Sequence, residues 1–150
     1  MRLVYLLAGC LPILGQASRV SSVTKAPGEK VTLTLSVDSQ PGKGPVSVKW
    51  EVIFPAQLIE MEGDAPERGT AAVDSGKSLQ CTARSPYLYA CLLSGGQTPI
   101  ADGPIAIFHF RIRTTAEAAT TALRIQKATA TTADSKELPL NNTESTVVIR

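Results

Sequence analysis

Strict alternation of apolar and polar residues constrains this chain more than any other feature. From Lys30 to Asp38 the sequence reads K-V-T-L-T-L-S-V-D, so aliphatic side chains alternate with hydroxyl-bearing ones. This two-residue period is typical of a β-strand with one buried and one wet face. Residues 45–54 repeat it, and their apolar face carries Val46, Val48, Trp50, Val52 and Phe54. The core is therefore predicted to be built from strands.

Turn residues divide the rest of the chain into further short strands. The segments 78–83 and 87–93 flank Arg84-Ser85-Pro86 and predict a hairpin. Residues 105–113 alternate again, with Ala106, Phe108, Phe110 and Ile112 inward. Shorter strands are expected at 58–61, 123–130 and 146–149, a short edge strand could form at 70–73, and one helical turn could form at 116–119. Short strands punctuated by Gly and Pro predict an all-β sandwich or barrel.

The N-terminus differs in composition from the rest of the chain. Leu3 to Gly15 is nearly continuously apolar and follows Arg2, which is the pattern of a secretory signal peptide. We expect cleavage after Ala17, which leaves residues 18–150 as one domain. Two alternatives stay open: lipidation at Cys10, within Leu-Ala-Gly-Cys, or an uncleaved anchor. The apolar run is too short for a membrane-spanning helix, which needs about 20 residues.

The cysteine count supports a disulfide. The chain has three cysteines, and removing residues 1–17 leaves Cys81 and Cys91 in an oxidising compartment, where pairing is the default. If these two residues face each other, the centre of the pairing falls at Pro86, on the turn of the predicted hairpin. The hairpin and the disulfide therefore support each other. The alternative is a pair of buried free thiols.

Composition argues against several functions. A length of 150 residues corresponds to about one domain, and a net charge of +2 with 19% charged residues gives no basic stripe for nucleic acid. His109 is the only histidine, no spacing of His, Cys and Asp provides a metal site, and no G-x-S-x-G elbow is present. We therefore expect no catalytic residue, no metal and no cofactor. The chain is predicted to bind and not to be an enzyme.

Exposed aromatic rings would favour sugar binding, because sugars stack on flat rings. Trp50 and the three phenylalanines fall on apolar strand faces and are assigned to the core. Tyr87 and Tyr89 are expected to share one strand face, about 7 Å apart by strand rise. They form either a binding surface or a cover over the core and the disulfide. His109 is expected on a wet strand face, as a surface residue or a ligand contact.

The order of these features resembles the cohesin domain of bacterial extracellular scaffolds. Ala-Pro-Gly-Glu-Lys-Val at 26–31 is similar to the opening cohesin strand. Residues 45–54, followed by Leu58, resemble the third strand. The most specific match is Ile-Ala-Asp-Gly-Pro-Ile-Ala at 100–106, running into Phe-His-Phe-Arg-Ile at 108–112. The resemblance covers roughly residues 20–149.

The resemblance implies a two-sheet antiparallel jelly-roll sandwich of about nine strands. It also implies protein–protein recognition, because cohesins bind dockerin modules through one flat sheet face. The strands matched to that face are 45–54, 78–83, 87–94 and 105–113. The outward residues carried over are Lys49, Glu51, Tyr87, Tyr89, His109 and Arg111.

The functional hypothesis is accordingly an exported, non-catalytic binding module of cohesin type. Its partner would be a dockerin-like protein in an extracellular or cell-surface assembly of a bacterium, with polysaccharide catabolism as one setting. The alternative is a carbohydrate-binding or cell-surface adhesion module, in which the partner is a polysaccharide. A flat face of mixed charge would favour a protein partner. An exposed row of tyrosines would favour sugar.

Overall fold

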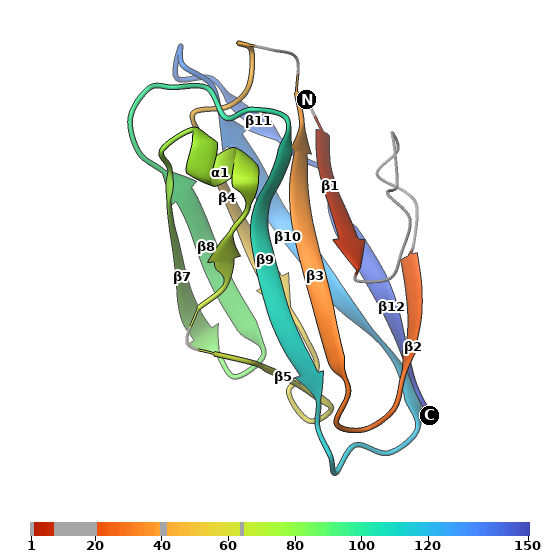
Figure 1. Ribbon diagram of the computed structural model, residues 1–150. Helices are drawn as coiled ribbons and strands as arrows, with labels where there is room; N and C mark the ends of the chain where they lie inside the picture. The colour runs from red at the N-terminus through yellow and green to blue at the C-terminus, as the bar shows by residue number, and fades with distance from the viewer. Residues whose placement is uncertain (1, 8–20, 40–41, 64) are drawn as a thin grey trace.

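The computed structural model describes residues 2–7, 21–39, 42–63 and 65–150, and it shows two β-sheets packed face to face (Figure 1). The five-stranded sheet has the order β1-β3-β9-β5, and β6 also pairs with β9. Its strands are β1 (Arg2–Leu7), β3 (Lys30–Asp38), β5 (Ile59–Met61), β6 (Glu67–Arg68) and β9 (Gly103–Ile112). The predicted all-β sandwich is confirmed.

The seven-stranded sheet has the order β2-β12-β10-β4-β8-β7, and β11 also pairs with β10. Among the described residues, its pairs are antiparallel apart from the parallel pair of β2 and β12. Its strands are β2 (Ser21–Lys25), β4 (Ser47–Ile53), β7 (Ser78–Ser85), β8 (Leu88–Ser94), β10 (Ala119–Thr131), β11 (Glu137–Pro139) and β12 (Thr143–Ile149).

The core lies between the sheets and consists of the apolar halves of the alternating strands. The predicted inward residues of β3, β4 and β9 are all buried. Aromatic rings join the two layers: Trp50 of β4 meets Phe108 of β9 edge-on at 6.5 Å, and Phe54 lies 5.3 Å from Phe110, between ring centroids. Such pairs stabilise beyond the area they bury, by about 0.5–1.5 kcal/mol each. Alternation in the sequence therefore fixes which side chains are left outside.

Two local predictions are wrong. Residues 70–73 form a helix, α1 (Thr70–Asp74), instead of an edge strand. Gly69 lets the chain pass so close to β9 that a Cβ there would lie 2.2 Å from the carbonyl oxygen of Pro104, and the small Ala71 and Ala72 are then buried. Residues 116–119 form no helical turn, because β10 begins at Ala119 and extends over thirteen residues.

The predicted leader falls partly within β1. Residues 2–7 pair antiparallel with β3, from Arg2 opposite Asp38 to Leu7 opposite Leu33. The predicted cleavage after Ala17 and the alternative lipidation at Cys10 lie outside the described residues and stay predictions. In the described ranges, no helix has both the length and the apolar character that crossing a bilayer requires.

The predicted disulfide is present in the structure. Cys81 of β7 and Cys91 of β8 lie directly opposite each other, with 4.1 Å between their Cα atoms. Pro86 and Tyr87 form the turn between the two strands, as the register predicted. Cys91 is buried beside Trp50, its neighbour across β4 and β8. Among the described strands, β7 pairs only with β8. The disulfide therefore holds this edge strand to its neighbour, on the side of the sheet that faces the core.

Removing both cysteines tests this role. The double variant Cys81→Ala, Cys91→Ala should lose about 2–3 kcal/mol of unfolding free energy, because the unfolded chain is no longer cross-linked. Urea unfolding followed by Trp50 fluorescence measures the loss. Reduction of the wild-type protein should produce a similar shift and leave the variant unaffected. An unchanged midpoint in the variant would contradict the proposed role.

Lys77 is fully buried at the junction of α1 and β7. Its Nζ donates to the carbonyl oxygens of Gly95 and Gly96, at 2.7 and 3.4 Å, and so ties this junction to the loop after β8. Burial away from water disfavours the ammonium form and lowers the pKa of Lys77 from its ordinary value of 10.5.

This lowered pKa predicts a pH dependence of stability. The folded state releases the Lys77 proton at a lower pH than the unfolded state, so the unfolding free energy should rise with pH up to about pH 10.5. Lys77→Met should remove that rise, whereas Lys136→Met, at an exposed lysine, should keep it. Urea midpoints at pH 7 and pH 10 measure both variants. Identical pH profiles for wild type and Lys77→Met would overturn the assignment.

Candidate functional site

The sheet order divides the six predicted binding residues between opposite sides of the molecule. Strands β4, β7 and β8 lie in the seven-stranded sheet beside β10, whereas β9 is central in the other sheet. The expectation that all six residues share one face is therefore wrong. The alternating pattern shows that His109 and Arg111 point outward from β9, but it does not show which sheet β9 joins.

The outward side of the neighbouring strands β10, β4, β8 and β7 forms one continuous surface, which we call the β4–β8 face. Cross-strand neighbours place Lys49 between Thr129 and Leu92, and Glu51 between Gln126 and Ala90. Leu92 is an exposed aliphatic residue at the middle of the face, with 41% of its surface accessible. A depression of about 820 Å³ lies here, and Pro139, Leu140 and Asn142 are among the residues that line it.

Glu51 is the best-fixed charge on this face. Its Oε1 accepts a hydrogen bond from Gln126 Nε2 at 2.9 Å and lies 3.7 Å from Nζ of Lys127. Only 20% of the Glu51 side chain is exposed, whereas 75% of the Lys127 side chain is. The face therefore presents a carboxylate held in one position and two lysines, Lys49 and Lys127, that extend into solvent.

Lys127 stands in a β-bulge. The register between β10 and β4 shifts between Gln126 and Thr129, and Lys127 has a φ of 51°, which residues other than Gly rarely adopt. The Asn142 side chain accepts a hydrogen bond from the Lys127 amide at 3.2 Å and supports this conformation. We did not predict the bulge, although a signal exists. The apolar period of β10 changes from two to three residues between Ile125 and Ala128.

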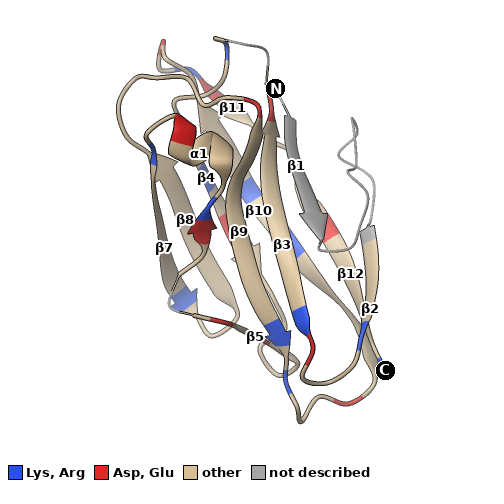
Figure 2. Cartoon of the chain, viewed as in Figure 1, with Lys and Arg blue, Asp and Glu red and all other residues tan. Residues whose placement is uncertain are grey.

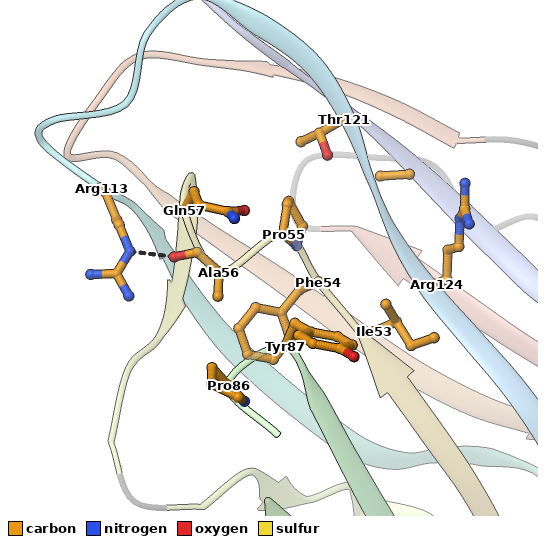
Figure 3. Close-up of a pocket in the computed structure, with 11 residues that line it drawn as sticks. Ile53, Phe54, Pro55, Ala56, Gln57, Pro86, Tyr87, Arg113, Thr121 and Arg124 are labelled. Carbon is orange, nitrogen blue, oxygen red and sulfur yellow. Dashed lines mark hydrogen bonds between the residues drawn. The ribbon is translucent and has the colours of Figure 1, made fainter. Parts of the chain in front are cut away.

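Tyr87 and Tyr89 do not share a face, so that prediction is also wrong. Tyr89 lies in β8 opposite Val52, points toward the core and stacks on Phe54 with 5.9 Å between ring centroids. Tyr87 lies in the two-residue turn, where the side-chain alternation of a strand does not continue, and it is 54% exposed. It lines a second cleft, at the end of the sandwich (Figure 3).

His109 and Arg111 each lie beside a carboxylate on the outer side of the five-stranded sheet. His109 Nε2 lies 3.5 Å from Glu67 Oε1, and Arg111 Nε donates to Glu62 Oε1 at 2.6 Å. The hydrogen bond from Arg111 is the main cause that lowers the pKa of the Glu62 carboxyl. Figure 2 shows basic residues at the adjoining lower ends of β3 and β9, where Lys30 also lies 3.6 Å from Glu62.

Arg111 of β9 is paired with Glu62, which follows β5, and His109 lies beside Glu67 of β6. A surface ion pair such as that of Arg111 contributes little to stability, and its charge is already compensated. In the part of the chain that the structure describes, no cluster of three or more His, Cys, Asp or Glu residues could hold a metal ion. The β4–β8 face is therefore the stronger candidate surface.

The bulge can be tested by a glycine exchange. Lys127→Gly should leave the unfolding free energy unchanged or raise it by up to about 1 kcal/mol, because Gly adopts a positive φ without strain. Lys49→Gly, in a regular strand of the same face, should lower it by about 0.5–1 kcal/mol. Thermal or urea unfolding of the two variants gives the comparison. Equal losses in both would exclude the bulge.

Several solved structures similar to this chain are cohesin modules. No protein-family model and no curated protein matches the chain. The sixth cohesin of scaffoldin B from Acetivibrio cellulolyticus, solved with a Cel5 dockerin mutant, is similar over 100% of both chains, with a TM-score of 0.74 and 14% identity. The solution structure of CaCohA2 from Clostridium acetobutylicum aligns over 86% of this chain and 88% of its own, with a TM-score of 0.69 and 20% identity.

A third similar structure comes from an archaeon. The non-cellulosomal cohesin of Archaeoglobus fulgidus aligns over 100% of this chain and 92% of its own, with a TM-score of 0.68 and 14% identity. At these identities the likeness shows the fold. It agrees with the jelly-roll sandwich that the resemblance to cohesins implied.

Proposed function

We propose that this chain, which has the cohesin fold, is a non-catalytic binding module whose protein partner docks on the β4–β8 face. The observation that carries the proposal is the composition of that face. It combines one exposed aliphatic side chain, Leu92, with the fixed carboxylate of Glu51 and the solvated amines of Lys49 and Lys127. An apolar centre within a charged border is typical of protein interfaces.

The structure of the face supports docking of a folded partner. Four neighbouring strands form it, and α1 packs against β9 on the other sheet. Glu51 is already held by Gln126, so a partner would pay little entropy to order it. Charges of both signs favour one orientation of the partner over others, which improves specificity more than affinity.

The partner class rests on the structural neighbours. The Acetivibrio cellulolyticus cohesin was solved with a dockerin, and so was the Coh-OlpA module of Clostridium thermocellum. We infer a dockerin-like partner for this chain, in an assembly outside the cytoplasm to which the predicted leader would direct it. Secretion or anchoring in the cell envelope, and a link to polysaccharide catabolism, belong to the same proposal.

We also propose that the chain is not an enzyme. The support lies in the placement of its one histidine. His109 lies beside Glu67 on the sheet opposite the β4–β8 face, so it cannot serve as a general base for chemistry on that face.

Substitution at the centre of the face tests the proposal. Leu92→Asp should weaken binding of a dockerin module by about fivefold or more, because loss of one central anchor commonly costs more than about 1 kcal/mol. Lys49→Glu should slow association and reduce the salt dependence of the rate. A panel of dockerin modules, together with envelope and supernatant proteins of the source organism, supplies the partners. Calorimetry and biolayer interferometry measure affinity and rates.

Matched substitutions on the other sheet complete the test. Val73→Asp changes an aliphatic residue of α1 that is 49% exposed, and Arg111→Gln changes a charged residue of β9. Both should leave binding within twofold of wild type. If the β9 variant loses binding and Leu92→Asp does not, the partner docks on the opposite face. If no variant changes the capture of a bound partner, the assignment to either sheet face fails.

A further inference from the structure

Tyr87 marks a second concave surface, separate from the β4–β8 face. A cleft of about 710 Å³ opens at the end of the sandwich, within the size range of ligand sites. It lies where β4 ends, the β7–β8 hairpin turns and β10 begins. Its residues include Phe54, Pro55, Pro86 and Tyr87 on the apolar side (Figure 3).

The apolar side of the cleft is rigid. Phe54 is 4% exposed, and its ring contacts those of Tyr89 and Phe110. Its amide donates to the carbonyl oxygen of Tyr87 at 3.0 Å, which fixes the turn to the end of β4. Tyr87 is thereby presented on a fixed backbone with 54% of its surface exposed. A preorganised ring of this kind offers a stacking surface at low entropic cost.

Polar side chains surround this aromatic surface. Figure 3 shows Arg113 and Arg124 on opposite sides of Tyr87, with Gln57 between Arg113 and Pro55 and Thr121 beyond Pro55. Each guanidinium group is paired with a carboxylate: Arg113 Nη1 lies 2.9 Å from Glu60 Oε2, and Arg124 Nε lies 3.0 Å from Glu144 Oε2. The cleft therefore offers N–H and O–H donors and oxygen acceptors around an apolar centre.

The main-chain groups at this cleft offer few free hydrogen-bond partners, which argues against a peptide ligand. Pro55 and Pro86 have no amide hydrogen. The carbonyl oxygen of Pro55 accepts from Leu58 and Ile59, and that of Ala56 accepts from Arg113 Nε at 2.6 Å. Peptides that add to a sheet edge need free main-chain donors and acceptors, and this stretch offers few. Recognition must come mainly from the side chains.

We propose that this cleft binds a neutral saccharide, with one pyranose ring stacked on Tyr87 and its hydroxyl groups hydrogen-bonded to the surrounding side chains. A sugar ring has an apolar C–H face and a rim of hydroxyls, which matches an aromatic surface with mixed donors and acceptors around it. The pairing of both arginines with glutamates leaves no net charge from these four residues. An acidic sugar would have to compete with Glu60 and Glu144, whereas a hydroxyl can share the guanidinium.

Affinity electrophoresis of the purified protein through soluble polysaccharides tests the proposal. The neutral gels contain xyloglucan, mixed-linkage β-glucan or galactomannan; polygalacturonate is the acidic comparison, and a decaproline peptide is titrated separately. Retardation by at least one neutral polymer is expected. Tyr87→Ala should weaken it by about tenfold or more, whereas Tyr87→Phe, which keeps the ring, should retain most of it.

Two of the variants already described distinguish this site from the β4–β8 face. Leu92→Asp should bind the polysaccharide as wild type does, and Tyr87→Ala should bind a dockerin module as wild type does. The two proposals can therefore fail independently. Absence of retardation in every neutral gel, equal retardation of Tyr87→Ala and wild type, or binding to polygalacturonate or decaproline alone would each overturn the assignment of a neutral saccharide.

Discussion

The structure depends on the contact between the apolar sides of β4 and β9. Trp50 meets Phe108 and Phe54 meets Phe110 across the gap between the sheets. Because side chains alternate along a strand, burying these rings forces Lys49 and Glu51 outward on one side of the sandwich and His109 and Arg111 outward on the other. A one-residue slip would exchange the two sets and expose the aromatic rings, so the core specifies both outer surfaces.

The alternating pattern predicted most of the strands and the core from sequence. Val31 to Val37 of β3 and Ala106 to Ile112 of β9 lie where the two-residue period placed them. The disulfide was also predictable, because the hairpin register and the position of Pro86 agree. Residues 70–73 were not predictable in the same way. Their helix depends on contact with β9, which Gly69 and two small alanines allow.

The sequence predicted only part of the candidate site. The two-residue period shows which side of a strand a residue faces, but it does not show which sheet the strand joins. Lys49 and Glu51 lie on the proposed face, but Arg111 lies on the opposite sheet, since β9 pairs with β3 and not with β4. Tyr87 and Tyr89 were separated by a turn, where the strand period ends. Lys127 was missed because its bulge adds a residue to β10, and a bulge is stabilised by tertiary contacts such as that with Asn142.

Phe54 couples the core directly to the end cleft, whereas the β4–β8 face is held in a different way. Its ring packs on Phe110 and Tyr89, and its amide holds the turn that presents Tyr87. Loosening the core at this position would therefore displace the stacking ring. The β4–β8 face is held differently, by ladder hydrogen bonds on both sides of β4 and β8. On the β4–β8 face the depression opens onto the broad interior of the sheet, which suits recognition of a protein surface. The end cleft lies where strands end and a turn passes them, and its exposed aromatic ring suits a small ligand.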